Sequence, residues 1–259
     1  MLYFSPALYS FLQTFYPFLL GFILMCEIKF VFLHLLQRFT MTQQHKIRTL
    51  LPEPTLRRLP WYLAYVSLLH KQNVEFVSST QIAKEIQVDA SQIAKDLSFL
   101  NIKGKTRIGY EVEMLVHELA DFLGFRECHN AFMVGVGSLG GALIHDSGLS
   151  QYGLNIIAGF DVKEDIVGTN ICGVTIHNMS EMCQLQKTTG TEIGILAVPV
   201  EHAQEAADSM IACGLKAIWN FTPYRIKAPE NIVIQNTSIY AHLALIYNRM
   251  QENEATTNQ

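Results

Sequence analysis

The chain has 259 residues, enough for one large domain or two small ones. Hydrophobic residues make up 49% and charged residues 16%, which is ordinary for a globular protein, and no low-complexity run or internal repeat is present. The net charge of −4 is uneven, because residues 41–127 hold 11 Lys and Arg against 10 Asp and Glu, whereas residues 128–259 hold 6 against 12. A strongly basic domain is therefore excluded, and any contact with nucleic acid needs a local patch.

The first forty residues differ from the rest of the chain. They carry only three charges, Glu27, Lys29 and Arg38, but eight of the fifteen phenylalanines. A run of about 20 apolar residues can span a bilayer, so a membrane anchor is one interpretation and a signal peptide is another. The third is an over-extended gene start, with translation beginning at Met41. We expect the third, with residues 1–40 outside the mature fold and no membrane partner.

The cysteines show no spacing typical of metal ligands. No CxxC pair is present, and none is spaced with histidine as in a metal site. We therefore expect no metal, and reduced structural thiols in a cytoplasmic protein. The five are Cys26, Cys128, Cys172, Cys183 and Cys213.

Apolar residues at helical spacing predict a first helix from Thr55, as its N-cap, to about Lys71. Two shorter helices follow within residues 77–100, the first capped by Ser78 or Ser79. Asp89 and Gln92 have the spacing of a capping box for the second.

Two short helices joined by a tight turn are the helix-turn-helix arrangement, here within the region from Tyr62 to Asn101. The apolar residues of the second helix predict which side faces inward. Its outward, DNA-facing residues are then Ser91, Gln92, Lys95 and Ser98.

Residues 101–112 predict a β-hairpin with a basic tip, the wing of a winged helix. Its charges, Lys103, Lys105 and Arg107, would contact phosphates and so position the second helix in the major groove. The alternative is a solvated basic loop on a helical dimerisation domain. A further amphipathic helix is predicted over residues 113–122.

The stretch FMVGVGSLGG contains a dinucleotide-binding motif between a predicted strand, residues 131–134, and a predicted helix. Its glycines permit a tight turn, a close approach of a pyrophosphate and close helix packing, and amides at the helix start would hold phosphates. A second strand ends in Asp161, about 20 residues after the motif, where an acid binds the ribose hydroxyls and disfavours a 2′-phosphate. NAD(H) is therefore favoured, against a glycine turn with no ligand. The motif residues are Gly135, Val136, Gly137, Ser138, Leu139 and Gly140.

Further strands alternate with a helix, which indicates a parallel α/β domain of the Rossmann type. They are predicted over residues 192–198, 217–221 and 232–235, with the helix over residues 201–213. Ligands of such sheets bind at the carboxyl ends of the strands. Val198, Pro199 and Asn220 follow strands there and are candidate cofactor contacts. The final helix, residues 238–249, packs on its own domain or on a partner subunit.

The segments VSSTQIAKEI, AKDLSF, GVGSLGGAL, GFD, VPVEHAQ and WNFTP, in this order, resemble the Rex family of redox-sensing transcriptional repressors. The resemblance implies a winged-helix domain, a Rossmann domain and a homodimer with exchanged C-terminal helices. It also implies that NAD⁺ permits binding to double-stranded operator DNA and that NADH releases it. The expected parts are the leader 1–40, a DNA-binding domain 41–127, an NAD(H) domain 128–236 and a dimerisation helix 237–254.

Several positions depart from the pattern of the family. Where relatives have a basic pair in the recognition helix, this chain has Ala94 before Lys95. An arginine of the first helix is replaced by Ala64, a tyrosine near the nicotinamide by Asp146, and an acid before the last helix by Ser238. The resemblance therefore implies NAD(H) binding more firmly than release of DNA by NADH.

Two other functions use the same nucleotide fold. An NAD-dependent oxidoreductase needs a catalytic acid or base, and His145, Asp146 and His202 lie near the glycine motif or the Val198 loop without a recognisable motif. A CoA-binding regulator is disfavoured by Asp161, because the ribose of CoA carries a 3′-phosphate. We expect a repressor that is not an enzyme.

Overall fold

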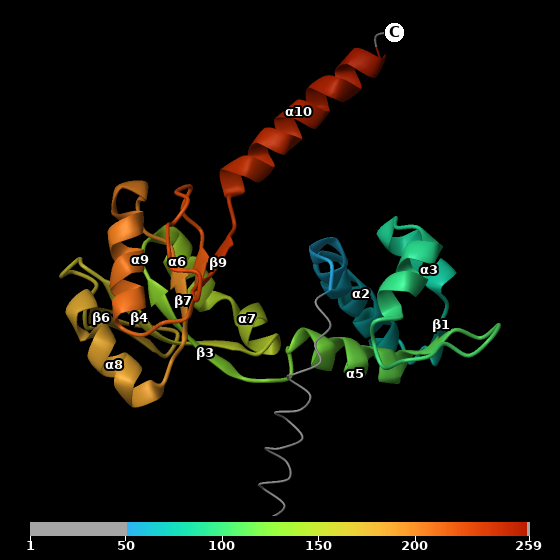
Figure 1. The fold of residues 1–259 in the computed structure, drawn as a ribbon, viewed down its shortest axis with the longest axis horizontal. Helices are drawn as coiled ribbons and strands as arrows, with labels where there is room; N and C mark the ends of the chain where they lie inside the picture. The colour runs from blue at the N-terminus through green and yellow to red at the C-terminus, as the bar shows by residue number, and fades with distance from the viewer. Residues whose placement is uncertain (1–50, 258–259) are drawn as a thin grey trace, which may run out of the picture.

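The computed structural model describes residues 51–257, with side chains as far as residue 253. Our expectation for residues 1–40 lies outside the described residues. Within residues 51–257, no helix has both the length and the apolar character needed to cross a membrane. Figure 1 shows two separate packed bodies joined near α5, and a last helix, α10, that extends away from both.

The N-terminal body is a bundle of helices closed by a short two-stranded sheet. Its core includes residues with no exposed surface on every helix, such as Leu59, Ile82, Ile93 and Leu115. The elements are α2 (Glu53–Lys71), β1 (Phe76–Val77), α3 (Ser79–Ile86), α4 (Ala90–Leu97), β2 (Tyr110–Glu111) and α5 (Val112–Leu123). Strands β1 and β2 pair antiparallel and complete the winged-helix order.

One local prediction in this body was wrong, and a second was confirmed only in part. Thr55 is not the N-cap of α2, which begins at Glu53 after Pro52; its hydroxyl is buried and donates to Asp96 Oδ1 at 3.0 Å. The hairpin predicted over residues 101–112 is confirmed at its turn, where Lys105 and Gly109 form an antiparallel bridge, but β2 beyond this turn pairs with β1.

The C-terminal body is a seven-stranded sheet in the order β5-β6-β4-β3-β7-β8-β9. All neighbours pair parallel except β5 with β6, so the predicted parallel α/β fold is confirmed with an antiparallel edge strand. The strands are β3 (His129–Val134), β4 (Leu154–Asp161), β5 (Asn170–Ile171), β6 (Val174–Asn178), β7 (Ile193–Leu196), β8 (Ala217–Asn220) and β9 (Val233–Asn236).

Alternation along β3 supplies the two faces of the sheet. Phe132 and Val134 pack on one face with residues of α8 and α9. Ala131 and Met133 pack on the other face with Ile144 of α6. The helices are α6 (Ser138–His145), α7 (Ser147–Gln151), α8 (Met182–Thr189) and α9 (Ala203–Ala212), with 3-10 turns at η1 (Met179–Glu181) and η2 (Val200–His202).

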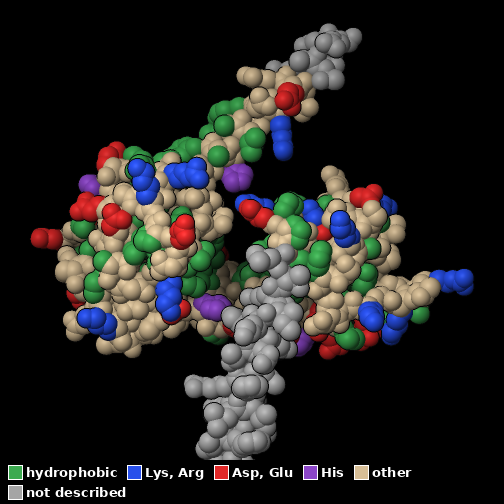
Figure 2. All heavy atoms as spheres, in the orientation of Figure 1, with side chains coloured by type: hydrophobic (Ala, Val, Ile, Leu, Met, Phe, Trp, Pro, Cys, Tyr) green, Lys and Arg blue, Asp and Glu red, His purple; other side chains and the backbone are tan. Residues whose placement is uncertain are grey.

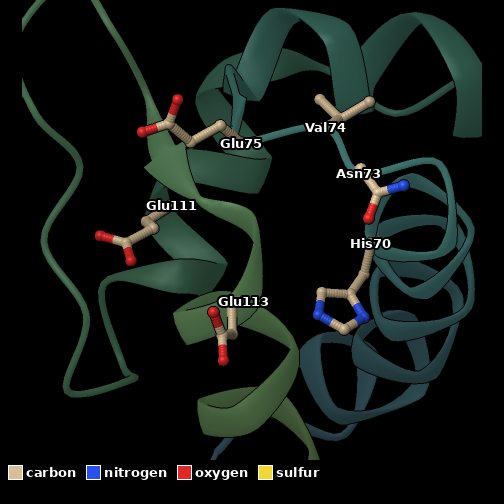
Figure 3. A pocket seen from close by; sticks show the side chains of 6 residues that line it. All are labelled: His70, Asn73, Val74, Glu75, Glu111 and Glu113. Carbon is tan, nitrogen blue, oxygen red and sulfur yellow. The ribbon is translucent and has the colours of Figure 1, made fainter.

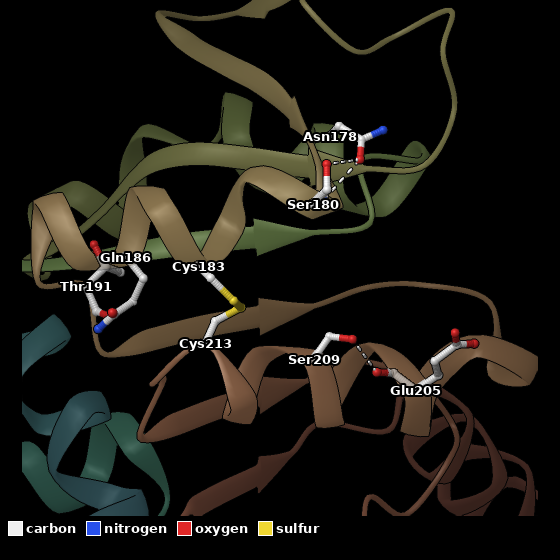
Figure 4. The surroundings of a disulfide bond; sticks show 8 residues. All are labelled: Asn178, Ser180, Cys183, Gln186, Thr191, Glu205, Ser209 and Cys213. Atoms are coloured by element: carbon white, nitrogen blue, oxygen red, sulfur yellow. Dashed lines mark hydrogen bonds between the residues drawn. A yellow bond between two sulfur atoms is a disulfide. The ribbon is translucent and has the colours of Figure 1, made fainter.

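A disulfide corrects our expectation for the cysteines. Cys183 on α8 is bonded to Cys213, which ends α9, so these two are not reduced thiols in this structure (Figure 4). Cys128 and Cys172 are free and exposed. Nothing in the 30-residue separation of the pair indicated the bond, because it depends on the packing of two helices that the sheet brings together.

The last helix, α10 (Ile239–Thr257), is longer than predicted and leaves apolar side chains in solvent. Ile246 is 53% exposed and Tyr247 is 58% exposed. Figure 2 shows hydrophobic side chains along the first half of this helix, away from both packed bodies. A helix that exposes this much apolar surface is typical of an interface.

Candidate functional site

The glycine loop joins β3 to α6 in the geometry that a nucleotide phosphate needs. Gly135 has a φ of 88°, and a Cβ there would lie 2.7 Å from both the Ala197 carbonyl oxygen and Val198 Cγ1. A Cβ on Gly140 would clash with the Gly135 carbonyl oxygen. By contrast, a Cβ on Gly137 would meet nothing within 4 Å, so the loop is open to solvent at this glycine.

The start of α6 keeps its amide donors available. Gly137 is the N-cap and no side chain caps the helix, so the first-turn N–H groups lack the partners that a capping residue supplies. Ser138 is exposed beside them. Open space above Gly137 and uncapped amides fit a pyrophosphate, which carries negative charge to the positive end of the helix dipole.

Asp161 ends β4 next to this loop and is 9% exposed. Its Oδ2 accepts a hydrogen bond from the Val136 amide at 2.8 Å, and its Oδ1 accepts from the amides of Val162 and Lys163 at 2.8 and 3.0 Å. The carboxylate therefore fixes the glycine loop against the end of the neighbouring strand. Oδ1 thus accepts two hydrogen bonds and Oδ2 accepts one, so Oδ2 keeps one lone pair that can accept from a ribose hydroxyl.

The loops after β7 and β8 lie at the same edge of the sheet. The chain leaves β3 in one direction to β4 and β6, and returns to the other side of β3 with β7. This is the switch point where ligands of open α/β sheets bind. Val198 contacts the position of Gly135 there, and Pro199 is exposed.

The Asn220 side chain organises its own loop. Its Nδ2 donates to the Tyr224 carbonyl at 2.8 Å and to Asn236 Oδ1 at 2.9 Å. Its Oδ1 accepts from the amide and hydroxyl of Thr222 at 2.9 and 2.7 Å. All of its hydrogen-bonding groups are engaged within the protein, so a ligand at this edge would meet the loop that Asn220 shapes.

The acid–base candidates beside the glycine loop do not form a catalytic pair. The Nδ1 of His145 hydrogen bonds the Gly141 carbonyl of its own helix at 2.7 Å. Asp146 Oδ1 accepts from the Gly148 amide at 2.9 Å and so caps α7. Both side chains are therefore hydrogen bonded to nearby backbone groups and not to each other.

The residues of α4 that we predicted to face DNA differ in their exposure. Ser91, Lys95 and Ser98 are exposed. Gln92 is half-buried, and its side-chain amide donates to Asp96 Oδ1 at 2.8 Å, whereas in a capping box its side-chain oxygen would accept from the backbone N–H of Asp89. The predicted capping box is therefore wrong, and Asp89 instead accepts from the Ser91 amide and hydroxyl at 2.7 and 2.5 Å.

Asp96 is the centre of a buried network that our sequence analysis missed. Its carboxylate has no exposed surface, and Arg58 of α2 donates to both oxygens at 2.7 and 2.8 Å. Tyr62 also donates to Oδ2 at 2.7 Å. Burial alone would raise the pKa of Asp96, but hydrogen bonds from Arg58, Tyr62, Gln92 and Thr55 outweigh it and lower the pKa to about 2. Burial and the bond to Asp96 raise the pKa of Tyr62 to about 12.

The network joins α4 to α2, because its members come from both helices. It therefore fixes the orientation of the helix that carries Lys95. The signal in the sequence was an acid among inward-facing apolar residues of α4, but its partners on α2 lie 34 to 41 residues away and leave no local pattern.

The basic turn projects between β2 and the end of α4. Lys103, Lys105 and Arg107 are exposed, and Arg107 has a φ of 66°. Lys105 Nζ lies 3.7 Å from Glu111 Oε2 and 4.8 Å from the centre of the Phe76 ring. A Cβ on Gly109, which has a φ of 109°, would clash with the Val77 carbonyl, so this glycine lets the turn pack on β1.

A pocket of about 230 Å³ lies between the end of α2 and the start of α5 (Figure 3). Its lining includes three glutamates, so it would repel DNA phosphates and is not part of a DNA-binding face. Nor do any three His, Cys, Asp or Glu residues in the described part of the chain form a group that could hold a metal ion. The lining residues are His70, Asn73, Val74, Glu75, Glu111 and Glu113.

Comparison with known proteins agrees with both halves of the fold. Residues 51–98 match a family described as "Putative DNA-binding protein N-terminus", and residues 127–224 match "CoA binding domain". A Bacteroides fragilis protein named redox-sensing transcriptional repressor Rex is 58% identical over 211 residues, covering 82% of this chain and 96% of that protein. The chain belongs to the Rex family of redox-sensing transcriptional repressors.

Two solved structures of a Rex-family repressor, RSP, share this fold. The complex of RSP with beta-NAD+ and operator DNA is 31% identical, with a TM-score of 0.76 and coverage of 82% of this chain and 97% of that one. The complex of RSP with beta-NADH is 31% identical, with a TM-score of 0.73 and coverage of 82% and 99%.

Two of the positions that depart from the Rex pattern make local hydrogen bonds here. Ala64 is exposed on α2. Asp146 caps α7, as described above. The Ser238 hydroxyl accepts from the Ala241 amide at 3.1 Å, as a capping residue of α10 does. The departures at Asp146 and Ser238 therefore stabilise helix starts instead of supplying the side chains usual in the family.

Proposed function

We propose that the protein is a transcriptional repressor that binds operator DNA and responds to the NADH/NAD⁺ ratio, with NADH weakening DNA binding. The proposal is carried by the presence of two sites in one chain. One is the glycine loop, with the uncapped start of α6 and Asp161 beside it. The other is the winged-helix body, on which Lys95 and Arg107 are exposed. RSP, of the same family, forms complexes with beta-NAD+ and operator DNA and with beta-NADH.

Each part of the nucleotide end has a role in this proposal. Residues 135–140 hold the pyrophosphate by backbone amides at the start of α6, where open space lies above Gly137. Asp161 accepts from a hydroxyl of the adenine ribose through Oδ2. Val198 and Pro199, with the loop shaped by Asn220, border the nucleotide at the switch point. The bound dinucleotide acts as a signal, because NADH and NAD⁺ favour different arrangements of the two bodies.

The protein acts as a homodimer in the cytoplasm in this proposal. The exposed apolar side chains of α10 need a partner, and a two-fold dimer would place two copies of α4 on a palindromic site. Residues 41–127 form the DNA-binding domain, residues 128–236 the NAD(H) domain and residues 237–254 the dimerisation segment.

The direct test is operator binding titrated against the NADH/NAD⁺ ratio at constant total nucleotide. We expect binding of two chains per palindromic duplex, highest in NAD⁺ and falling as NADH increases, measured by fluorescence anisotropy and sedimentation. Binding that does not depend on the ratio would contradict redox control and leave a DNA-binding protein with a structural nucleotide.

The DNA face is tested by replacing Lys95 with Ala and Arg107 with Asn, which tolerates the positive φ of residue 107. Two lost phosphate or base contacts should weaken operator binding by at least 10-fold and lower the salt dependence, log K against log [salt], by about one unit per contact. Lys71→Ala, at the end of α2 beside the acidic pocket, is the matched control and should bind as the parent does. If the Lys71→Ala control weakened operator binding as much as the double variant does, this placement of the DNA-binding face would be refuted.

Two alternatives make different predictions. The match of residues 127–224 to a CoA-binding family supports a CoA ligand, but the Asp161 carboxylate favours a ribose with free hydroxyls. An oxidoreductase would need a catalytic acid or base near the nucleotide. His145 and Asp146 instead form hydrogen bonds to nearby backbone groups. We therefore propose that the protein is not an enzyme. Turnover of NADH with a carbonyl substrate, or displacement of NADH by CoA, would contradict this.

A further inference from the structure

Cys183 and Cys213 are brought together by the packing of α8 against the end of α9. Their Cα atoms lie 4.4 Å apart although they are separated by 30 positions in the sequence, and their sulfur atoms are bonded. Figure 4 shows the bond bridging the two helices beside β7. Both residues are half-buried, and Cys213 packs against the core that includes Met182 and Met210.

The backbone on either side of the pair is firmly held. The side-chain amide of Gln186 donates to the backbone carbonyl of Thr191 at 3.2 Å. This hydrogen bond fixes the end of α8 to the segment just before β7. The Cys213 amide donates to the Ser209 carbonyl at 3.0 Å. Gly214, with a φ of 99°, then turns the chain beside Gln186. The two cysteines therefore face each other at bonding distance because of their surroundings, in contrast to Cys128 and Cys172, which are exposed and free.

We propose that Cys183 and Cys213 are a thiol–disulfide couple oxidised by hydrogen peroxide, a second redox input distinct from NADH. In the cytoplasm, where the proposed function places the protein, thiols stay reduced until an oxidant arrives. The peroxide O–O bond breaks as one thiol is oxidised to a sulfenic acid, with release of one water. The second sulfur attacks it, the S–S bond forms and a second water leaves. Two thiols lose two electrons to one hydrogen peroxide.

Oxidation would constrain the part of the nucleotide domain that carries one side of the site. The covalent loop from Cys183 to Cys213 contains β7, the Val198–Pro199 turn and α9. Closing it restricts the unfolded chain and opposes local opening of α8 and α9. The oxidised form therefore keeps this side of the sheet folded under oxidative stress.

The site is tested by peptide mapping of the full chain, reduced and then treated with hydrogen peroxide. Trypsin places Cys172 and Cys183 together in residues 164–187 and Cys213 in residues 188–216, so the Cys172→Ser variant is used to make the assignment unambiguous. We expect one linked pair of these peptides and a loss of two titratable thiols per chain, reversed by dithiothreitol. Linkage through Cys128, or Cys183 converted to sulfinic acid with Cys213 still free, would overturn the proposal.

A stability measurement separates the couple from general oxidation. The thermal midpoint of the parent should rise by roughly 5–10 °C on oxidation and return on reduction. Cys213→Ser, and independently Cys183→Ser, should show no rise, while Cys172→Ser should behave as the parent does. A rise that persists in either variant of the pair would contradict the assignment. None of these measurements requires DNA or NADH, so failure of the proposed repressor function would not change their outcome.

Discussion

Replacing Asp161 with Ala is expected to weaken NADH binding about 100-fold, close to 3 kcal/mol, from a parent affinity in the micromolar range or tighter. A charge-assisted hydrogen bond to the ribose, worth about 1.5–3 kcal/mol, would be lost. The Val136 amide would also lose its acceptor, which loosens the glycine loop. Isothermal calorimetry of NADH and of NADPH on both proteins measures the effect.

A comparison of NADH with NADPH distinguishes the two roles of Asp161, which are binding of the ribose and ordering of the glycine loop. The carboxylate repels a 2′-phosphate, so the parent should prefer NADH over NADPH, and the variant should lose most of this preference. A residue that only ordered the loop would instead lower both affinities equally. Asp165→Ala, an exposed acid on the following loop, is the control and should change neither affinity. Equal affinities of the parent for NADH and NADPH would contradict the ribose assignment.

The glycine loop and its flanking strands were the most predictable part of the candidate site because their signals in the sequence are local. The glycine motif, the strand before it and the acid at the end of the next strand lie in one short segment, and the backbone geometry of Gly135 and Gly140 accounts for their glycines. The segment from Val162 to Gly190 was left without predicted elements, yet it contains β5, β6 and α8. Its short strands alternate exposed and buried residues over too few positions to give a clear period.

Contacts between distant residues account for the other differences. Gln92 was predicted to face outward from its position on α4, but the carboxylate at Asp96 draws its amide inward. Residues 101–112 have the glycines of a hairpin, but the strand at the end of this segment, β2, pairs with β1. Strand β1 precedes the helix-turn-helix in the sequence. The disulfide likewise depends on helix packing. In each case the partner lies in another element, and composition and periodicity carry no information about it.

The buried Asp96 network should contribute more to stability than any other ion pair described in the N-terminal body. Asp96→Ala would leave Arg58, Tyr62 and Thr55 without their acceptor, and breaking a buried pair in this way costs about 3–5 kcal/mol. Glu53→Ala is the matched control, since its ion pair with Arg57 on the same helix is exposed, at 72% and 66% for the two side chains. That change should stay within about 0.5 kcal/mol. Urea denaturation measures both.

Acid titration gives an independent measure of the same carboxylate. The folded pKa of Asp96 is lowered to about 2 from 3.8, so its stabilisation is complete above pH 3.8 and is lost as the pH falls toward 2. The parent should therefore lose about 2 kcal/mol more than Asp96→Asn over this range, because the amide does not titrate. If both lose stability in parallel, Asp96 is not held as a buried carboxylate. Because the network positions α4, Asp96→Asn should also weaken operator binding while NADH affinity stays at the parent value, which places its effect on the DNA-binding body alone.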